Sequence, residues 1–331
     1  MKKILNDPNE AAAELLDGLV DYYNGKVIKV GPGAIALSDI ADDKVGLLVG
    51  GGAGHEPIYH GLIGPGMADG AACGDIFAAP PPNIILEATR AVNKGKGVLY
   101  LYGNYAGDLM NFKIAAQLAA AEGIKVETVL IWDDVASAPP SKKEDRRGIA
   151  GLIPIVKLAG AAADIAKDLD ELVSLVTNAR DNTRSVGVAL SPGSIPATGK
   201  PTFELDEDSI GIGMGIHGEQ GVGIEKMMSA DALAEKMVDL ILADDLPIGL
   251  GDEVLVLINS LGATTMMECL IVLKKVKAIL VEKGVSIYDV MLGPLVTCQE
   301  MAGLSISFTK LNDTLKPLWD APCSSLGYTK L

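Results

Sequence analysis

Short apolar runs alternate with longer, helix-patterned segments along most of this chain. The apolar runs are Val45–Val49, Val98–Tyr102, Val126–Ile131, Val186–Leu190, Ile210–Ile216, Val254–Ile258 and Leu304–Phe308. Segments with helical spacing fall between several of them, at Ala115–Ala121, Ala161–Val176 and Ala230–Leu242. Runs this short and this apolar are typical of buried strands, and their alternation with helices predicts a layered α/β architecture.

The length of 331 residues favours two domains over one. A polar stretch, Asn178–Ser185, follows a helix-patterned segment and precedes a new apolar run, as a domain boundary commonly does. We therefore predict two α/β domains with layered sheets, residues 1–182 and residues 183–331.

Glycine-rich or polar loops follow the apolar runs. In chain order they are GGGAGHEP (residues 50–57), GNYAGD, the pair Asp133 and Asp134, SPGSIPATG, HGEQG and NSLGATT. Open α/β sheets bind ligands at the carboxyl ends of their strands. We therefore expect these loops to line one shared cleft, or two facing ones.

The chain has three histidines, and two of them lie in such loops. Glycines flank His55 and His217, so each imidazole has little packing to orient it and an open approach for a small molecule. A lone loop histidine more often caps a turn through its own ring nitrogen, but two such loops favour a ligand site. His60 has ordinary neighbours and is interpreted as structural or solvated.

Asp108 ends the stretch YGNYAGD (residues 102–108) and is a further candidate. A carboxylate there could act as general base or orient a histidine, or it could equally cap a helix that begins at Leu109. Asp133 and Asp134 are interpreted as solvated loop residues or helix caps.

Charge and composition exclude several classes of function. A formal charge of −15 disfavours nucleic acid and anionic membranes as partners. No apolar run approaches the roughly 20 residues that span a bilayer, and the amino terminus lacks the apolar core of a signal peptide, so we expect a cytoplasmic protein. The cysteines form no C-x-x-C pair, which indicates reduced structural thiols and no metal site; they are Cys73, Cys269, Cys298 and Cys323.

Two stretches nearly match nucleotide-binding motifs. Gly213–Gly218 has the G-x-G-x-x-G pattern, but further glycines follow where a dinucleotide site needs a helix, so a dehydrogenase is the weakest alternative. Gly193–Lys200 resembles a phosphate-binding loop with one residue too many between its glycines, and Pro201 replaces the Ser or Thr that would hold magnesium. We therefore expect no nucleoside triphosphate site on this chain.

From about residue 10 to the carboxyl terminus, the chain resembles the K subunit of phosphotransferase-dependent dihydroxyacetone kinases, DhaK. The resemblance rests on ordered motifs: GGGAGHEP, GPGMADGAACGDIFAAP, NYAGDLMNF, DRRGIAG, PATGKPTF, GIHGEQG, NSLGAT and LWDAP. It implies a homodimer of two-domain α/β chains that binds a short ketose covalently.

The resemblance also implies roles for individual residues. His217 would add a ring nitrogen to the ketose carbonyl and form a hemiaminal, while His55 and Asp108 would hydrogen-bond the substrate hydroxyls and assist proton removal. Gly52, Ala53 and Gly54 would supply backbone contacts. A reversible bond to carbon adds affinity for a small triose and selects carbonyl compounds over glycerol.

The family's nucleotide lies on a separate protein. The resemblance implies ATP or ADP with magnesium on an L subunit (DhaL), an M protein as phosphoryl donor to that subunit, and no cofactor or metal on this chain.

Gly103 departs from the family pattern, because many members have lysine immediately before the Asn-Tyr of this motif. The change would mean weaker transition-state stabilisation, a charge supplied by a partner, or a pocket roomy enough for a four-carbon ketose such as erythrulose. A second alternative is a ketose-sensing coactivator of a transcription regulator. Such a paralogue would keep His217 without needing His55 and Asp108, so their joint presence favours the kinase subunit.

Overall fold

The structure is a computed structural model that describes residues 2–215, 217–219 and 221–331. The last residue of the predicted run Ile210–Ile216 and Gln220 of the loop HGEQG lie outside the described residues. The predicted α/β class is confirmed, since helices alternate with strands that form two mixed six-stranded sheets.

The described chain divides into two compact units that are each discontinuous in sequence. Unit 1 contains the residues up to Leu130, Pro154–Ala179 and Leu315–Leu331, and unit 2 contains Ile131–Ile153 and Arg180–Thr314. The predicted division between residues 182 and 183 lies near the crossing from unit 1 to unit 2 at Arg180. Segment Ile131–Ile153 lies in the predicted first domain but belongs to unit 2. Segment Leu315–Leu331 lies in the predicted second domain but belongs to unit 1.

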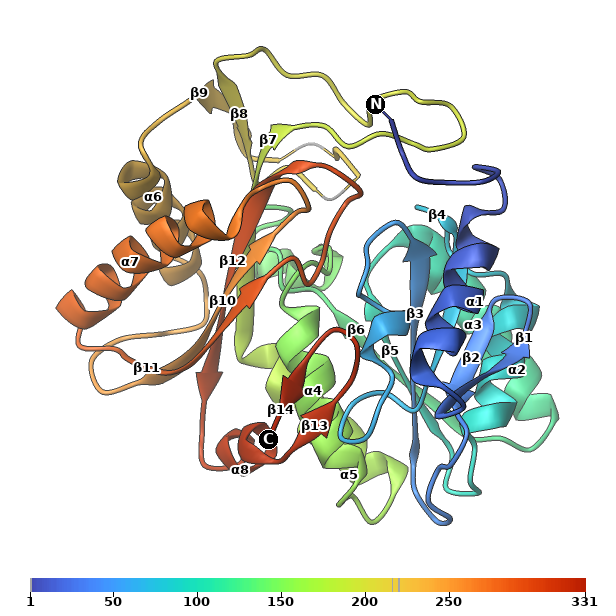
Figure 1. The fold of residues 1–331 in the computed structure, drawn as a ribbon. Helices are drawn as coiled ribbons and strands as arrows, with labels where there is room; N and C mark the ends of the chain where they lie inside the picture. Colours follow the sequence, from blue (N-terminus) through green and yellow to red (C-terminus); the bar gives the residue numbers. More distant parts are fainter. Residues whose placement is uncertain (1, 216, 220) are drawn as a thin grey trace. The chain divides into compact units, whose positions relative to one another are not determined.

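The sheet of unit 1 has the strand order β1-β2-β4-β3-β5-β6 (Figure 1). Its strands are β1 (Val27–Gly31), β2 (Ala34–Leu37), β3 (Gly46–Ala53), β4 (Gly70–Ile76), β5 (Val98–Gly103) and β6 (Val126–Ile131). Strand β3 is parallel to both β4 and β5, whereas β2 pairs antiparallel with β1 and β4. The carboxyl ends of β3 and β5 therefore lie at the same edge, as we expected for the loops that follow them.

The first part of the chain also forms helices that cover this sheet. They are α1 (Ala11–Tyr23), α2 (Pro82–Val92) and α3 (Ala106–Ala121), and α2 packs against α3 and against β2, β3 and β4. The predicted helix Ala161–Val176 is wrong, because α4 (Leu152–Ala163) ends and α5 (Leu169–Asp181) begins within it. Asp168 explains the restart, since its Oδ1 accepts the Glu171 amide at 2.9 Å and so caps α5.

Short elements complete this description. The 3₁₀ turns η1 (His60–Leu62) and η2 (Pro140–Asp145) connect longer elements, and the chain ends with α8 (Leu315–Asp320) and a small ladder of β13 (Cys323–Ser324) and β14 (Thr329–Lys330). Trp319 of α8 is fully buried within unit 1, so this carboxyl-terminal segment is part of that unit's core.

The sheet of unit 2 has the order β11-β10-β12-β7-β8-β9 (Figure 1). Its strands are β7 (Thr183–Ser191), β8 (Ser209–Ile212), β9 (Gly223–Lys226), β10 (Glu253–Ser260), β11 (Ser286–Gly293) and β12 (Ala302–Leu311). Helices α6 (Ala230–Leu242) and α7 (Met266–Glu282) pack on the sheet and share an apolar core with it. Only β10 and β11 are parallel; the other neighbours recorded in this sheet are antiparallel.

This antiparallel order corrects the expectation that all the special loops share one kind of edge. Because β8 runs antiparallel to β7, the chain that leaves β8 runs toward the amino end of β7, and the Gly213 amide donates to the Gly187 carbonyl in the middle of that strand at 2.7 Å. Strands β7 and β10 are both antiparallel to β12, so the loops SPGSIPATG and NSLGATT lie at the opposite edge. The expectation relied on the rule for open α/β sheets, whereas the strands of this sheet are mixed in direction.

Candidate functional site

The glycines at the end of β3 allow neighbouring segments to pack very closely. A Cβ added at Gly51 would lie 2.1 Å from the Tyr59 ring, and one at Gly52 would lie 2.7 Å from the Ala78 nitrogen. Both distances are far shorter than a carbon atom can tolerate, so these glycines are required by packing. Gly54 has a different role: its φ of 100° is in the region that favours glycine, and it turns the chain into His55.

His55 is more enclosed than its flanking glycines suggested. Its side chain is buried, and its ring lies 5.0 Å from the Phe77 ring, tilted by 37°. Glu56 supports the turn, because its Oε1 accepts the Gly54 amide at 2.7 Å and lies 3.3 Å from Nε2 of His60. His60 is itself buried, so it is a structural residue packed beneath this loop and not a solvated one.

Asp108 lies in the first turn of α3. The helix begins at Ala106 with Tyr105 as its N-cap residue, so the alternative that Asp108 caps a helix starting at Leu109 is wrong. Asp108 is buried beside Tyr102: burial, and then the charge of Asp108, raises the pKa of that phenol. A carboxylate is favoured here because the amino end of a helix carries partial positive charge.

The loops that carry His55 and Asp108 meet at Gly103. A Cβ added at Gly103 would lie 3.2 Å from the Tyr105 ring and 3.3 Å from the Tyr59 hydroxyl. Tyr59 follows His55 in the loop after β3, and Tyr105 precedes Asp108 in the loop after β5. The structure therefore brings these two candidate loops of unit 1 together, with Gly103 at their junction.

His217 belongs to unit 2, in the turn between the antiparallel strands β8 and β9. Its Nδ1 lies 2.9 Å from Oε1 of Glu219, and its backbone amide donates to Oε2 of the same carboxylate at 2.9 Å. One carboxylate thus holds both the ring and the backbone of His217. The chain continues into β9, not into a helix, so the G-x-G-x-x-G pattern lacks the helix terminus on which a dinucleotide would lie.

Glu219 is ionised and is held in turn by Arg147. Burial alone would raise the pKa of Glu219, but hydrogen bonds from His217 outweigh it and lower the pKa to about 2. Nη1 of Arg147 lies 4.0 Å from Oε2 of Glu219, and Nη2 donates to the Gly213 carbonyl at 2.9 Å. A Cβ at Gly215 would lie 2.1 Å from Oε2 of Glu219, so glycine is needed there for the carboxylate to reach His217.

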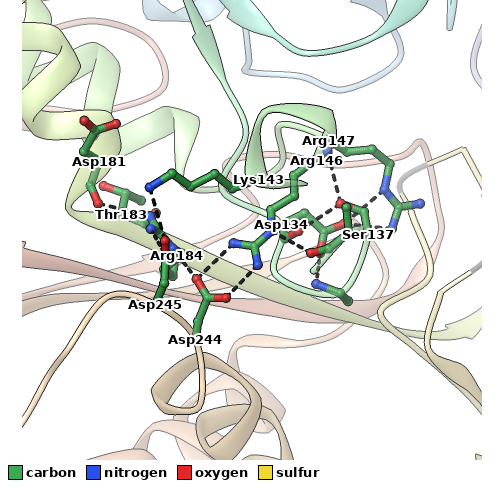
Figure 2. A network of polar contacts seen from close by, with 12 residues as sticks. Asp134, Ser137, Lys143, Arg146, Arg147, Asp181, Thr183, Arg184, Asp244 and Asp245 are labelled. Carbon is green, nitrogen blue, oxygen red and sulfur yellow. Dashed lines mark hydrogen bonds and ion pairs between the residues drawn. The ribbon is translucent and has the colours of Figure 1, made fainter. Parts of the chain in front are cut away.

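Asp134 fixes the orientation of Arg147, and this corrects the interpretation of the acidic pair as solvated or helix-capping. Figure 2 shows Asp134 beside Arg147, whose Nη2 and Nε donate to Oδ2 at 2.7 and 3.0 Å. Asp133 is fully buried and accepts the amides of Ile149 and Gly151, each at 2.8 Å. Both aspartates are buried because the segment that carries them packs beside β7, where the Val135 amide donates to Ser185.

Sequence reasoning therefore missed Glu219, Arg147 and Asp134 as parts of this site. A weak signal was present for Glu219, which lies two residues after His217 in GIHGEQG. Arg147 was visible only within the motif DRRGIAG, with nothing local to connect it to the histidine.

Two kinds of feature are absent from the described residues. Among the residues that the structure describes, no group of three or more His, Cys, Asp or Glu side chains could hold a metal ion. Within the same ranges, no helix combines the length and hydropathy needed to cross a bilayer.

The sequence matches the family model of the Dak1 domain over residues 17–327, and the chain belongs to this family. It is similar to the dihydroxyacetone-binding subunit DhaK of the PTS-dependent dihydroxyacetone kinase 2 of Listeria innocua. The two are 41% identical over 329 residues, which cover 98% of each chain. The resemblance to DhaK is thereby confirmed.

Two further relatives carry different descriptions. The D-erythrulose kinase of Mycolicibacterium smegmatis is 38% identical over 330 residues, which make up 100% of this chain and 57% of that protein. The solved structure of a dihydroxyacetone kinase operon co-activator superposes with a TM-score of 0.88 at 30% identity, covering 95% of this chain and 97% of that one. This superposition supports the α/β fold.

Proposed function

We propose that this chain is the ketose-binding subunit of a phosphotransferase-dependent dihydroxyacetone kinase. It binds dihydroxyacetone as a hemiaminal on His217 and presents a substrate hydroxyl for phosphorylation. The phosphoryl group comes from an L subunit that carries ATP or ADP with magnesium and is recharged by an M protein, and the chain itself acts as a homodimer. The observation that carries the proposal is the two-point contact of Glu219 with His217, supported by the similarity to DhaK subunits.

The proposed capture step follows from this contact. When Nδ1 of His217 keeps its proton and donates a hydrogen bond to the ionised Glu219, the lone pair of the ring lies on Nε2. Nε2 attacks the ketose carbonyl carbon, a nitrogen–carbon bond forms, the C=O π bond breaks, and the oxygen takes up a proton from water to become a hydroxyl. The ring gains a positive charge, which the Glu219 carboxylate stabilises. Reversal of these steps releases the ketose.

The residues of unit 1 are assigned to the phosphoryl transfer step. Asp108 accepts the proton of the attacking hydroxyl, and His55 hydrogen-bonds a substrate hydroxyl, while Gly52, Ala53 and Gly54 supply backbone contacts. Phosphoryl transfer depends mainly on positioning and charge stabilisation, and general base assistance adds to these. The burial of both side chains supports this assignment, since fixed groups lose little freedom when substrate binds.

Replacing Glu219 with glutamine is expected to weaken dihydroxyacetone binding about tenfold to a hundredfold, because the ring loses a charged hydrogen-bond partner. The glutamine side chain has only one accepting oxygen, whereas both carboxylate oxygens of Glu219 accept from His217. Calorimetric titration would measure the dissociation constant. Because the pKa of Glu219 is lowered from 4.5 to about 2, its carboxylate stays ionised and holds His217 at pH values above 4.5. The contribution of this contact to ketose binding declines only as pH falls toward about 2.

The control for this variant is Glu207→Gln, which removes an exposed carboxylate of the same unit. It should leave the dissociation constant unchanged. Equal affinity in the Glu219 variant and the wild type would show that Glu219 does not assist capture.

Gly103 provides a test of substrate size. Its φ lies outside the left-handed region, and a side chain requires only small shifts of Tyr59 and Tyr105, so Gly103→Lys should fold. We expect lysine to fill space at the junction of the two loops and to raise the preference for dihydroxyacetone over erythrulose about tenfold. The ratio of kcat/KM for the two ketoses measures this preference. An unchanged ratio would show that residue 103 does not set substrate length.

A coactivator role is the second candidate, favoured by the structural similarity to a kinase operon co-activator. Such a protein would bind the ketose without phosphorylating it. Formation of dihydroxyacetone phosphate by this chain with an L subunit and Mg-ATP would decide for the kinase subunit.

A further inference from the structure

Phe77 has a backbone conformation that its residue type rarely adopts. It follows β4, and its φ of 59° lies in the left-handed region, where a bulky side chain is strained. Most of the described residues with a positive φ are glycines. Strain of this kind persists only where the surrounding structure enforces it, and strained positions cluster at functional sites. A phenyl ring at this position therefore indicates a role for the ring.

Phe77 is the third residue of a tight turn. The Ala78 amide donates to the Asp75 carbonyl at 3.0 Å and closes the turn, while the Phe77 amide donates to the Ala53 carbonyl at 2.9 Å. Turns that need a positive φ at their third residue usually have glycine or asparagine there. Glycine at position 77 would form the same turn without strain, so the turn itself does not explain the phenylalanine.

Close packing holds this turn against the ends of β3 and β4. A Cβ added at Gly52 of β3 would lie 3.1 Å from the carbonyl carbon of Phe77 and 2.7 Å from the nitrogen of Ala78. A Cβ added at Gly74 of β4 would lie 2.1 Å from the carbonyl oxygen of Ala78. Both glycines are therefore needed for the turn to lie where it does, and this packing enforces the strained backbone.

The turn places the Phe77 ring against His55. The two ring centroids are 5.0 Å apart and the ring planes are tilted by 37°, a geometry within the range of aromatic contacts. The segment after Phe77 also contacts α3, the helix that carries Asp108, because the Asn111 side chain donates to the Pro80 carbonyl at 3.0 Å. One short segment thus touches both His55 and the helix of the second candidate residue in unit 1.

We propose that Phe77 is a positioning residue, whose ring fixes the His55 imidazole for its hydrogen bond to a substrate hydroxyl. This inference rests on the proposed function, in which His55 serves the phosphoryl transfer step. An imidazole held against a fixed ring loses little freedom when substrate binds, and a displacement of about 1 Å in such a group lowers the rate about a hundredfold. The strained backbone is retained because it places the ring there.

The test compares three substitutions by kcat for dihydroxyacetone phosphorylation, with saturating L subunit and Mg-ATP. Phe77→Ala and Phe77→Gly remove the ring, and we expect each to lower kcat about tenfold or more while capture of the ketose on His217 continues. Phe77→Tyr keeps the ring and should retain most of the activity. Urea unfolding should give Phe77→Gly a higher midpoint than Phe77→Ala, because glycine adopts a φ of 59° without strain.

A double-mutant comparison shows whether Phe77 acts through His55. If it does, Phe77→Ala lowers kcat in the wild-type background but adds little further loss to His55→Asn. Proton NMR measures the contact without substrate, since the ring current of Phe77 shifts the ring-proton signals of His55. We expect Phe77→Ala to remove this shift, and the spectrum of His55→Asn identifies which signals belong to His55.

Several results would overturn the positioning role: wild-type kcat in Phe77→Ala, an equal further loss in the His55→Asn background, or His55 signals that Phe77→Ala leaves unchanged. A loss in Phe77→Tyr as large as in Phe77→Ala would also overturn it. A midpoint for Phe77→Gly no higher than for Phe77→Ala would overturn the strain from which the role is inferred. Shifted His55 signals in a wild type that neither captures nor phosphorylates the ketose would retain the positioning of His55 and refute the proposed function.

Discussion

His217→Ala is expected to abolish covalent capture of dihydroxyacetone and to lower kcat/KM for its phosphorylation by about a thousandfold or more. The reason is that a carboxylate at 2.9 Å fixes Nδ1 of His217, and Nε2 of the same ring is the attacking atom in the proposed capture step. The imidazole is 27% exposed in a surface turn, so the free energy of unfolding should change by less than about 1 kcal/mol. A coupled assay with saturating L subunit and Mg-ATP measures the loss of activity.

The matched variant for this experiment is His55→Asn, which removes a different loop histidine. In our account this variant still captures the ketose, because His217 is intact, but phosphorylates it slowly. If His217→Ala retained most of the activity, the covalent mechanism would be wrong. If His55→Asn were as active as the wild type, the role given to His55 would be wrong.

The second large effect is on stability, and we expect Asp244→Asn to destabilise unit 2 by about 3–5 kcal/mol. Asp244 accepts from Nη1 and Nη2 of Arg146 at 2.9 and 2.6 Å and also pairs with Nε of Arg184 (Figure 2). The three side chains are 3%, 0% and 2% exposed. Removing the shared carboxylate charge would deprive both buried guanidinium groups of this counterion, although Arg184 would keep its ion pair with Asp245.

This loss should extend to activity, because Arg146 directly precedes the residue that supports Glu219. The urea midpoint of unfolding measures the stability, and ketose affinity measures the connection to His217. Asp170→Asn is the control: Asp170 pairs with Lys125 on the surface, where the two side chains are 79% and 57% exposed, and its loss should not shift the midpoint measurably. Equal midpoints for the Asp244 variant and the wild type would contradict the assigned role of this buried network.

The sequence predicted local elements better than their arrangement. The run Val126–Ile131 coincides with β6 and the segment Ala230–Leu242 with α6, and each other apolar run overlaps a strand. Strand β4 (GAACGDI) was missed because glycine and alanine give no β-branched run, although the strand is buried. The antiparallel pairing of β8 with β7 was also missed, because strand direction depends on long-range pairing that no local pattern encodes.

In the candidate site, too, local features were predicted better than long-range contacts. Two loops of unit 1 were correctly expected at one sheet edge, because β3 and β5 have the parallel arrangement that the argument assumed. The support of His217 could not be predicted, since Arg147 reaches Gly213 across 66 residues of sequence. Asp134 looked like a solvated residue because its burial arises only when its segment packs beside β7.

The most direct test of the central claim is a carbon NMR spectrum of dihydroxyacetone labelled at the carbonyl, mixed with the chain containing ¹⁵N-histidine. We predict a protein-bound signal in the tetrahedral-carbon region that shows one-bond coupling to histidine nitrogen in the wild type and is absent in His217→Ala. The coupling separates the adduct from the free hydrate of the ketose. A wild-type spectrum without this coupling, for both dihydroxyacetone and erythrulose, would contradict covalent capture by His217.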